Sequence, residues 1–434
     1  MLPATVCGLF VHPAEVAGGA LAWTAGLTML PQVAPRQLAL FGSLSLLGAL
    51  GMVLGAARGA RPDWQMVLTA NQMLITLLVA VSFLRLVAGP QSARERRNTG
   101  NGERHRRRAP WQNPRGRRAV WQSMLGVHLL GAVINISVVD IVGERLLAED
   151  KNRRGPLLLL SRAYSSGAFW SPFWGAAAAV FTYAPSARLS VLIAVGGLAA
   201  VIGLTVSAFT VTGALGDVRN FRGFPLSVEF LVVPLTLVVA VLTAHALLPT
   251  LPVSGVITVC SLCLTLIALS PRGVRTMRQE LSRHAVTHLP LMRQELTLFL
   301  AAGAMAAGLS ELTESFGRRL PIDHFGAVQA YLLLLVMVSV SMIGIHPVIS
   351  IAVSAGLLQS AHPDPTLFAM TGLLAWGIQA AGGPLSGLNV VMHGRFGIDS
   401  FTLARWNAKY VVGCLAMAAG LLPLCNLLSS SVWP

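Results

Sequence analysis

The sequence predicts an all-α polytopic membrane protein with about 9–10 spans, arranged as an inverted-topology repeat with two re-entrant helical hairpins. Three observations lead to this fold class. The 434 residues are 54% hydrophobic and only 11% charged, with a mean hydropathy of +0.67, which excludes a soluble globular domain. Long apolar segments follow one another along the chain, and two of them contain helix breakers near the middle. Basic residues gather in two loops between segments.

The apolar segments are long enough to enter a bilayer, since a spanning helix needs about 20 residues. They are 38–57, 66–88, 121–147, 156–184, 189–212, 225–248, 252–270, 294–316, 327–360, 365–394 and 408–428. Residues 1–34 are interrupted by prolines and form either one irregular span or an interfacial helix. Segment 327–360 exceeds one straight crossing, and Gly344-Ile345-His346-Pro347 provides a break.

Two loops carry most of the net charge of +15. Residues 91–118 hold ten Arg and two Glu, and residues 271–293 hold five Arg and one Glu. Such loops indicate the cytoplasmic side of the membrane under the positive-inside rule. We therefore expect a multi-pass protein of the bacterial cytoplasmic membrane, with membrane lipid rather than nucleic acid as the partner of these arginines.

The breakers in segments 156–184 and 365–394 predict two re-entrant hairpins. The first segment contains Ser171-Pro172 and the second contains Gly383-Pro384. If both segments crossed the membrane fully, while their neighbours also crossed, several basic residues would lie outside. If both return to the side they entered, the basic residues lie inside, as the rule requires.

One hairpin then opens to the outside and the other to the inside, which indicates an inverted repeat. The tripeptides Gly126-Val127-His128 and Gly344-Ile345-His346 precede the two hairpins. The chain divides into N-terminal membrane segments (1–65), repeat 1 (66–212) with its hairpin near 156–184, connecting spans with a basic cytoplasmic loop (213–293), and repeat 2 (294–434) with its hairpin near 365–394.

In this architecture the chain resembles the ion transporter superfamily, which includes divalent anion:sodium symporters, arsenite permeases and the large subunits of tripartite carriers. The resemblance is architectural: in place of the Ser-Asn-Thr tips of the symporters, the chain has Trp170-Ser171-Pro172 and Pro384-Leu385-Ser386-Gly387-Leu388-Asn389. It implies a substrate site between the tips, an elevator-like movement and a homodimer.

Broken helices expose backbone groups that can hold a solute. Intramembrane ionisable residues are also candidates for function, because they are costly to bury. The substrate-binding candidates are Ser171, Pro172, Gly383, Pro384, Ser386 and Asn389. The candidates for ion or proton coupling are His128, Asn135, Asp140 and His346. For each residue, a role in packing or hydrogen bonding alone is the alternative.

These features predict a secondary active transporter that moves a small solute, preferably an anion, and is driven by H⁺ or Na⁺. We expect no enzyme activity, no cofactor and no metal, since the chain has no phosphate-binding loop, metalloprotease motif or nucleophile elbow. Two alternatives remain: a polytopic membrane enzyme or anchor that acts on a lipid-phase substrate, and a membrane interaction scaffold.

Overall fold

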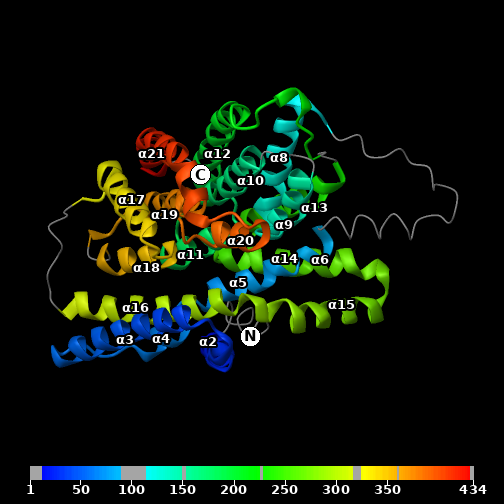
Figure 1. Cartoon of the computed structure of the whole chain (residues 1–434). Helices are drawn as coiled ribbons and strands as arrows, with labels where there is room; N and C mark the ends of the chain where they lie inside the picture. Colours follow the sequence, from blue (N-terminus) through cyan, green and yellow to red (C-terminus); the bar gives the residue numbers. More distant parts are fainter. Residues whose placement is uncertain are drawn as a thin grey trace.

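The computed structural model describes residues 12–88, 114–148, 153–224, 228–315, 324–358 and 361–430. Within these ranges the regular secondary structure is entirely helical, and the only strand-like pairing is a single bridge between Arg115 and Arg222. The basic segment 91–113 and residues 1–11 lie outside the described residues. The all-α fold class is therefore confirmed for the part of the chain that the structure describes (Figure 1).

The longer helices suit a membrane environment by length and composition. Six stretches are long and apolar enough to cross a bilayer: Gln37–Ala57, Trp64–Val87, Leu189–Thr212, Val253–Arg272, Val274–Thr313 and Ser400–Ser430. Many of their outward side chains are large and apolar, for example Val53, Phe209 and Ile267, each at least 64% exposed. These features indicate a multi-pass membrane protein.

The first half of the chain contains most of the short helices. Its α-helices are α2 (His12–Met29), α3 (Pro35–Ala57), α4 (Trp64–Thr69), α5 (Gln72–Ser82), α6 (Arg85–Ala88), α8 (Gly116–Ile134), α9 (Ser137–Ala148), α10 (Arg154–Ser165), α11 (Gly175–Tyr183) and α12 (Leu189–Thr212). A 3₁₀ turn, η2 (Ser166–Phe169), extends α10. The expected spans 66–88, 121–147 and 156–184 are thus each interrupted.

The second half contains longer helices. They are α13 (Val228–Leu247), α14 (Val253–Leu269), α15 (Val274–Thr287), α16 (Arg293–Ser315), α17 (Ala327–Met342), α18 (Pro347–Leu358), α19 (Pro365–Gly382), α20 (Gly387–Phe396) and α21 (Ser400–Ser430). Four residues separate α17 from α18, and Gly344 among them has a φ of +97°, which favours glycine. The break expected at 344–347 is confirmed.

Helices α3 and α16 lie side by side along their lengths (Figure 1). Small residues allow this close approach: a Cβ on Gly48 would lie 2.5 Å from the carbonyl oxygen of Ala304, and one on Gly51 would lie 2.5 Å from that of Gly308. Helix α14 packs against α5 in a second, similar pair. Both pairs join an element of one half of the chain to an element of the other half.

Helices α8 and α9 run antiparallel and are joined by a two-residue turn. Near the turn, a Cβ on Gly131 of α8 would lie 3.2 Å from a methyl group of Val138 of α9. Farther from the turn, Phe224 contacts both helices, since its backbone N–H donates to α8 and its ring lies under the guanidinium of Arg145 in α9. The expected span 121–147 is therefore a pair of helices that leave and return to the same end.

The next segment, from α10 through α11, runs along α19 in the opposite direction. The contacts proceed in order from one end of α19 to the other. The contacting pairs are Ser165 with Gly377, Val180 with Gly372, and Arg188 with Thr366. This is the path of a broken crossing, and the described contacts contain no returning arm of the hairpin expected at 156–184.

Helix α21 returns along α19 after the short helix α20. The contacting pairs are Asn407 with Ala381, Val411 with Gly382, and Cys425 with Thr366. The segment that runs antiparallel to α19 is thus α21, and not residues 387–394. The helix breaks expected in segments 156–184 and 365–394 are confirmed, whereas the re-entrant hairpins expected at these two places are not.

Basic residues gather at the end of the bundle where α10 and α21 begin. Arg145 lies over Phe224 there, and Arg395 pairs with Asp140 at 2.8 Å. Arg154 lies over the ring of Trp406 near the start of α21. We call this the basic end, and we call the end at Arg188 and Thr366 the opposite end.

Candidate functional site

Two helix breaks are buried inside the bundle. The first break comprises residues 170–174, between η2 and α11, and the second comprises residues 383–386, between α19 and α20. Ser171 and Pro172 lie in the first, and Gly383, Pro384 and Ser386 lie in the second. All five are buried. Backbone groups freed by a break need partners when no water is present, so the hydrogen bonds at each break define what it can do.

The first break is held by tryptophans that reach α8. Trp174 donates its Nε1–H to the carbonyl oxygen of Gly131 at 2.9 Å. Ser171 donates its hydroxyl to the carbonyl oxygen of Ala132. Side chains of the first break therefore donate hydrogen bonds to carbonyl oxygens next to the α8–α9 turn. These hydrogen bonds stabilise both the break and the turn.

His128 links the first break to α10. Its Nε2 accepts the Nε1–H of Trp170 at 3.0 Å, and its Nδ1 lies 2.9 Å from Ser166 Oγ and 3.2 Å from the carbonyl oxygen of Ala163. This network assigns the ring proton to Nδ1. Both ring nitrogens have partners, so a proton relay through His128 requires that the Trp170 contact open first.

Asn135 lies in the α8–α9 turn with a φ of +54°, which is unusual for a residue other than glycine. Its Oδ1 accepts a hydrogen bond from the hydroxyl of Tyr164 in α10. A Cβ on Gly131 would lie 3.0 Å from the same tyrosine ring. The α8–α9 turn is thus packed against the helix that leads into the first break.

The second break is held mainly by its own side chains. Ser386 donates to the carbonyl oxygen of Ala380 at 2.8 Å and accepts the backbone N–H of Asn389 at 3.1 Å, so it caps α20. Asn389 donates its amide to the carbonyls of Ala381, at 3.2 Å, and Gly383, at 2.9 Å. The last carbonyls of α19 are therefore satisfied within one stretch of chain.

Arg162 is the buried cation nearest to the second break. It is only 6% exposed. Its Nε donates to Asn407 Oδ1 and one terminal nitrogen donates to Thr210 Oγ1, both at 2.9 Å. Asn407 donates in turn to the carbonyl of Ala381, which Asn389 also contacts. Among the described residues Arg162 contacts no carboxylate, so its charge is compensated only by neutral groups.

The other coupling candidates lie apart from these networks. His346 lies in the α17–α18 turn, edge-on to Trp376 with ring centroids 4.9 Å apart, and its Nδ1 accepts the N–H of Val348. Asp140 forms an ion pair with Arg395 at the basic end, and its side chain is 28% exposed. That ion pair joins α9 to α20.

The two histidines do not occupy matching places. His128 is inside α8, seven residues before Asn135, whereas His346 is in the turn itself. The two tripeptides thus differ in their position relative to the turns, which contain Asn135 and Gly344, each with a positive φ.

Sequence reasoning did not single out Tyr164, Ser166, Thr210 or Asn407 as site residues. Asn407 lies 245 positions from Arg162, so no local pattern connects them. Asn407 directly precedes the apolar segment 408–428 and stands between Arg405 and Lys409, so the sequence gives no signal that separates it from a polar approach to a span.

No family model matches the chain, and no curated protein matches it.

Proposed function

We propose that the protein is a secondary active transporter that moves a small anion across the cytoplasmic membrane and is driven by H⁺ or Na⁺. The observation that carries this proposal is the antiparallel packing of two broken segments, α10–α11 and α19–α20, with both breaks buried in the bundle. Broken helices at the interface of inverted repeats hold the solute in many secondary transporters.

The inverted repeat is part of the proposal, with its hairpins at positions other than those first expected. The first hairpin is α8–α9, which opens at the basic end. The second is α17–α18. Met342, at the end of α17, lies beside Gly382, at the end of α19, and α17 packs along α19, so α17 begins near the opposite end. Ile351 of α18 lies beside Gly372, which indicates that α18 returns there.

Each hairpin is followed by a broken segment, and each turn lies near the break that follows. The α8–α9 turn contacts the first break through Gly131 and Ala132. The α17–α18 turn lies close to the second break through Met342. The order hairpin, broken segment, long helix is thus α8–α9, α10–α11, α12 in one half and α17–α18, α19–α20, α21 in the other, with opposite orientation.

Hairpins at α8–α9 and α17–α18 satisfy the positive-inside rule to the same extent as hairpins at 156–184 and 365–394. With the basic end inside, Arg153, Arg219 and Arg395 all lie inside, and the loop at Arg188 lies outside. Within each pair of segments, 121–147 and 156–184 or 327–360 and 365–394, one must return. Loop charges do not distinguish which one.

Arg162 supports an anion as the solute. A buried guanidinium without a carboxylate partner is costly unless an anion compensates it for part of the cycle. In addition, α11 begins at Gly175 without a side-chain cap, so its first N–H groups and its dipole favour a negative charge. An elevator-like movement of the two hairpins and broken segments relative to α3 and α16 would expose this region to either side.

The side of the membrane on which each loop lies is tested with single cysteines. They are introduced into a variant that lacks the native cysteines, Cys7, Cys260, Cys263, Cys414 and Cys425. Ser186→Cys should react with an impermeant maleimide from outside, and Gly394→Cys only from inside, under either placement of the hairpins. Arg153→Cys and His362→Cys distinguish them. We expect residue 153 inside and residue 362 outside, and the reverse would restore the hairpins at 156–184 and 365–394.

Transport is tested in proteoliposomes under imposed pH and Na⁺ gradients with a panel of small carboxylates and inorganic oxyanions. Arg162→Gln should lower uptake at least about 100-fold, equivalent to roughly 2.7 kcal/mol, whereas the exposed Arg154→Gln should retain most activity. Replacing Pro172 or Pro384 by alanine should impair transport more than stability. Full uptake by the Arg162→Gln variant, or by the variant with both prolines replaced, would reject the assignment of the solute site.

A further inference from the structure

Helix α15 links α14 to α16, and among the described residues it contacts other elements with one face only. His284 lies on that face, with its Nε2 3.0 Å from Ser82 Oγ and its ring 4.6 Å from the ring of Phe83. Met277 and Leu281 are partly buried on the same side. The helix therefore has an inner face that packs on α5 and an outer face that is open.

The outer face carries three exposed arginines, Arg275, Arg278 and Arg283. The single acidic residue of α15, Glu280, is already paired with Arg272 at 2.8 Å. No described carboxylate contacts the three arginines. The outer face is therefore a cationic surface whose charge the rest of the described chain does not neutralise.

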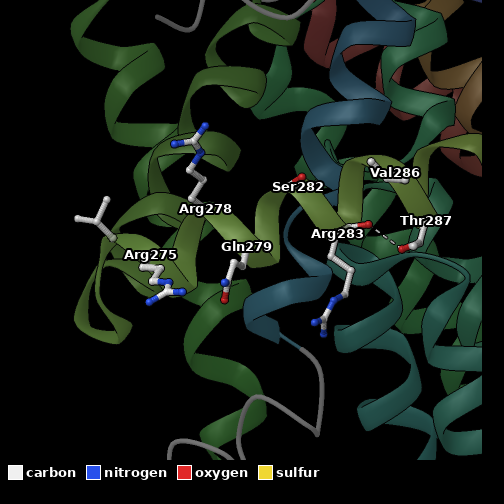
Figure 2. Close-up of a pocket in the computed structure, with 8 residues that line it drawn as sticks. Arg275, Arg278, Gln279, Ser282, Arg283, Val286 and Thr287 are labelled. Carbon is white, nitrogen blue, oxygen red and sulfur yellow. Dashed lines mark hydrogen bonds between the residues drawn. The ribbon is translucent and has the colours of Figure 1, made fainter.

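Polar side chains complete this face. Gln279, Ser282 and Thr287 lie along α15 beside the arginines. Figure 2 shows the side chains of Arg278 and Arg283 leaving the helix on opposite sides, so they do not converge on one point. A single small anion would not engage all three guanidinium groups, whereas a row of separate anions would.

Exposed apolar residues accompany the arginines. Val274 is 76% exposed, Val286 is 71% exposed, and Leu291, four residues after the end of the helix, is 64% exposed. A mixture of guanidinium and large apolar groups suits the boundary between lipid headgroups and acyl chains. A nucleic acid or an acidic protein would gain little from the valines. Helix α15 also leads directly into α16, and residues 274–313 together form one of the stretches suited to the membrane.

We propose that the outer face of α15 binds anionic phospholipid headgroups, with Arg275, Arg278 and Arg283 each holding a separate phosphate. Guanidinium groups pair with phosphate through two parallel hydrogen bonds, which favours arginine at such a surface. The valines insert between the headgroups. The lipid fixes α15 against the bilayer and thereby fixes the junction between α14 and α16.

The test uses the full-length protein in mild detergent with an equimolar mixture of phosphatidylglycerol and phosphatidylcholine. Native mass spectrometry counts the lipids of each kind that remain bound. We expect wild type to retain phosphatidylglycerol preferentially. The variant Arg275→Gln/Arg278→Gln/Arg283→Gln should lose that preference by about 100-fold, since each of the three arginines near an anionic surface contributes roughly a factor of five. The preference of wild type should also fall as salt is raised.

Two control variants separate the effect of this surface from the effect of net charge. Arg275→Lys/Arg278→Lys/Arg283→Lys keeps the charge and should keep most of the preference. Arg58→Gln/Arg61→Gln removes arginines elsewhere and should leave it unchanged. Equal phosphatidylglycerol retention in wild type and the triple glutamine variant would overturn the proposal, and so would an equal loss in the Arg58/Arg61 control. A preference of wild type for a short DNA duplex over phosphatidylglycerol would also overturn it. Melting temperature and gel filtration report whether each variant is folded.

Discussion

The two helix breaks differ in the origin of the hydrogen bonds that support them. The first break relies on another element, since Trp174 and Ser171 donate to carbonyls of α8. The second relies mainly on its own neighbourhood in the chain, since Ser386 and Asn389 donate to the carbonyls that end α19 and only Asn407 adds a donor from α21. A break of the first kind is sensitive to movement of its neighbour, whereas one of the second kind keeps its shape when the neighbour moves.

The difference indicates a division of roles within the proposed transporter. The second break is a stable unit that carries its polar groups with it as α19 moves. The first break and the α8–α9 turn form one coupled unit, so a shift of the hairpin would alter both. Arg162 connects the two, because it lies one helical turn before Ser166 and reaches Asn407 beside the second break. Four predictions test this comparison, beginning with the largest expected effect.

The largest effect is expected from Gly196→Ala, which presses on the first break from α12. A Cβ at this position would lie 2.0 Å from the backbone oxygen of Phe169. A backbone atom cannot rotate away, so we expect a loss of about 3 kcal/mol or more in the free energy of unfolding. Thermal melting in detergent measures it.

The neighbouring substitution Gly197→Ala is the matched control. No atom lies within 4 Å of a Cβ at this position, and alanine favours the helix over glycine by roughly 0.5–1 kcal/mol. Similar melting temperatures for the two variants would show that the first break tolerates pressure from α12. The first break would then not depend on its neighbours more than the second does.

The next effect concerns the tryptophans of the first break. Trp174→Phe leaves the buried carbonyl of Gly131 without its donor, which costs about 1–3 kcal/mol in addition to the lost ring volume. Trp170→Phe removes the bond to His128, but Trp170 is only partly buried, so the loss should be smaller. Melting curves of both variants give the order. A larger loss of stability for Trp170→Phe would mean that Trp170, and not Trp174, contributes most to the stability of the first break.

At the second break, Asn389 and Asn407 share the carbonyl of Ala381. Each single alanine variant leaves this carbonyl one donor. We expect about 1 kcal/mol of destabilisation for Asn389→Ala, and roughly 1.5–3 kcal/mol for Asn407→Ala because this change also removes the acceptor of the Arg162 guanidinium. The double variant leaves it none. Its loss should exceed the sum of the single losses by at least about 0.5 kcal/mol, as measured by a double-mutant cycle. Strict additivity would mean that the two asparagines act independently.

The smallest effects are expected at the start of α20. Ser386→Ala removes the N-cap and should cost about 1 kcal/mol. Gly387→Ala meets no atom within 4 Å and should change the stability by less than about 0.5 kcal/mol. A cost for Ser386→Ala as large as that for Trp174→Phe would mean that the two breaks are supported equally, contrary to the comparison.

Composition and residue order are enough for the coarse architecture of this protein. The low charge and long apolar segments predict an all-α membrane protein, because lipid requires every backbone group to be satisfied within the helix. The breakers at Pro172, Pro384 and Gly344 also predict where helices end, since proline and glycine act on the backbone locally. These features depend on neighbouring residues in the chain.

The path of each segment inside the bundle depends instead on contacts between distant residues. Loop charges report only the side on which a loop lies, so they do not distinguish a hairpin at α8–α9 from one at 156–184. The antiparallel path follows from pairs such as Arg188 with Thr366. Likewise, Arg162 has its buried partners because α10, α12 and α21 pack together. Such partners are chosen by packing in three dimensions, and no local pattern in the chain encodes them.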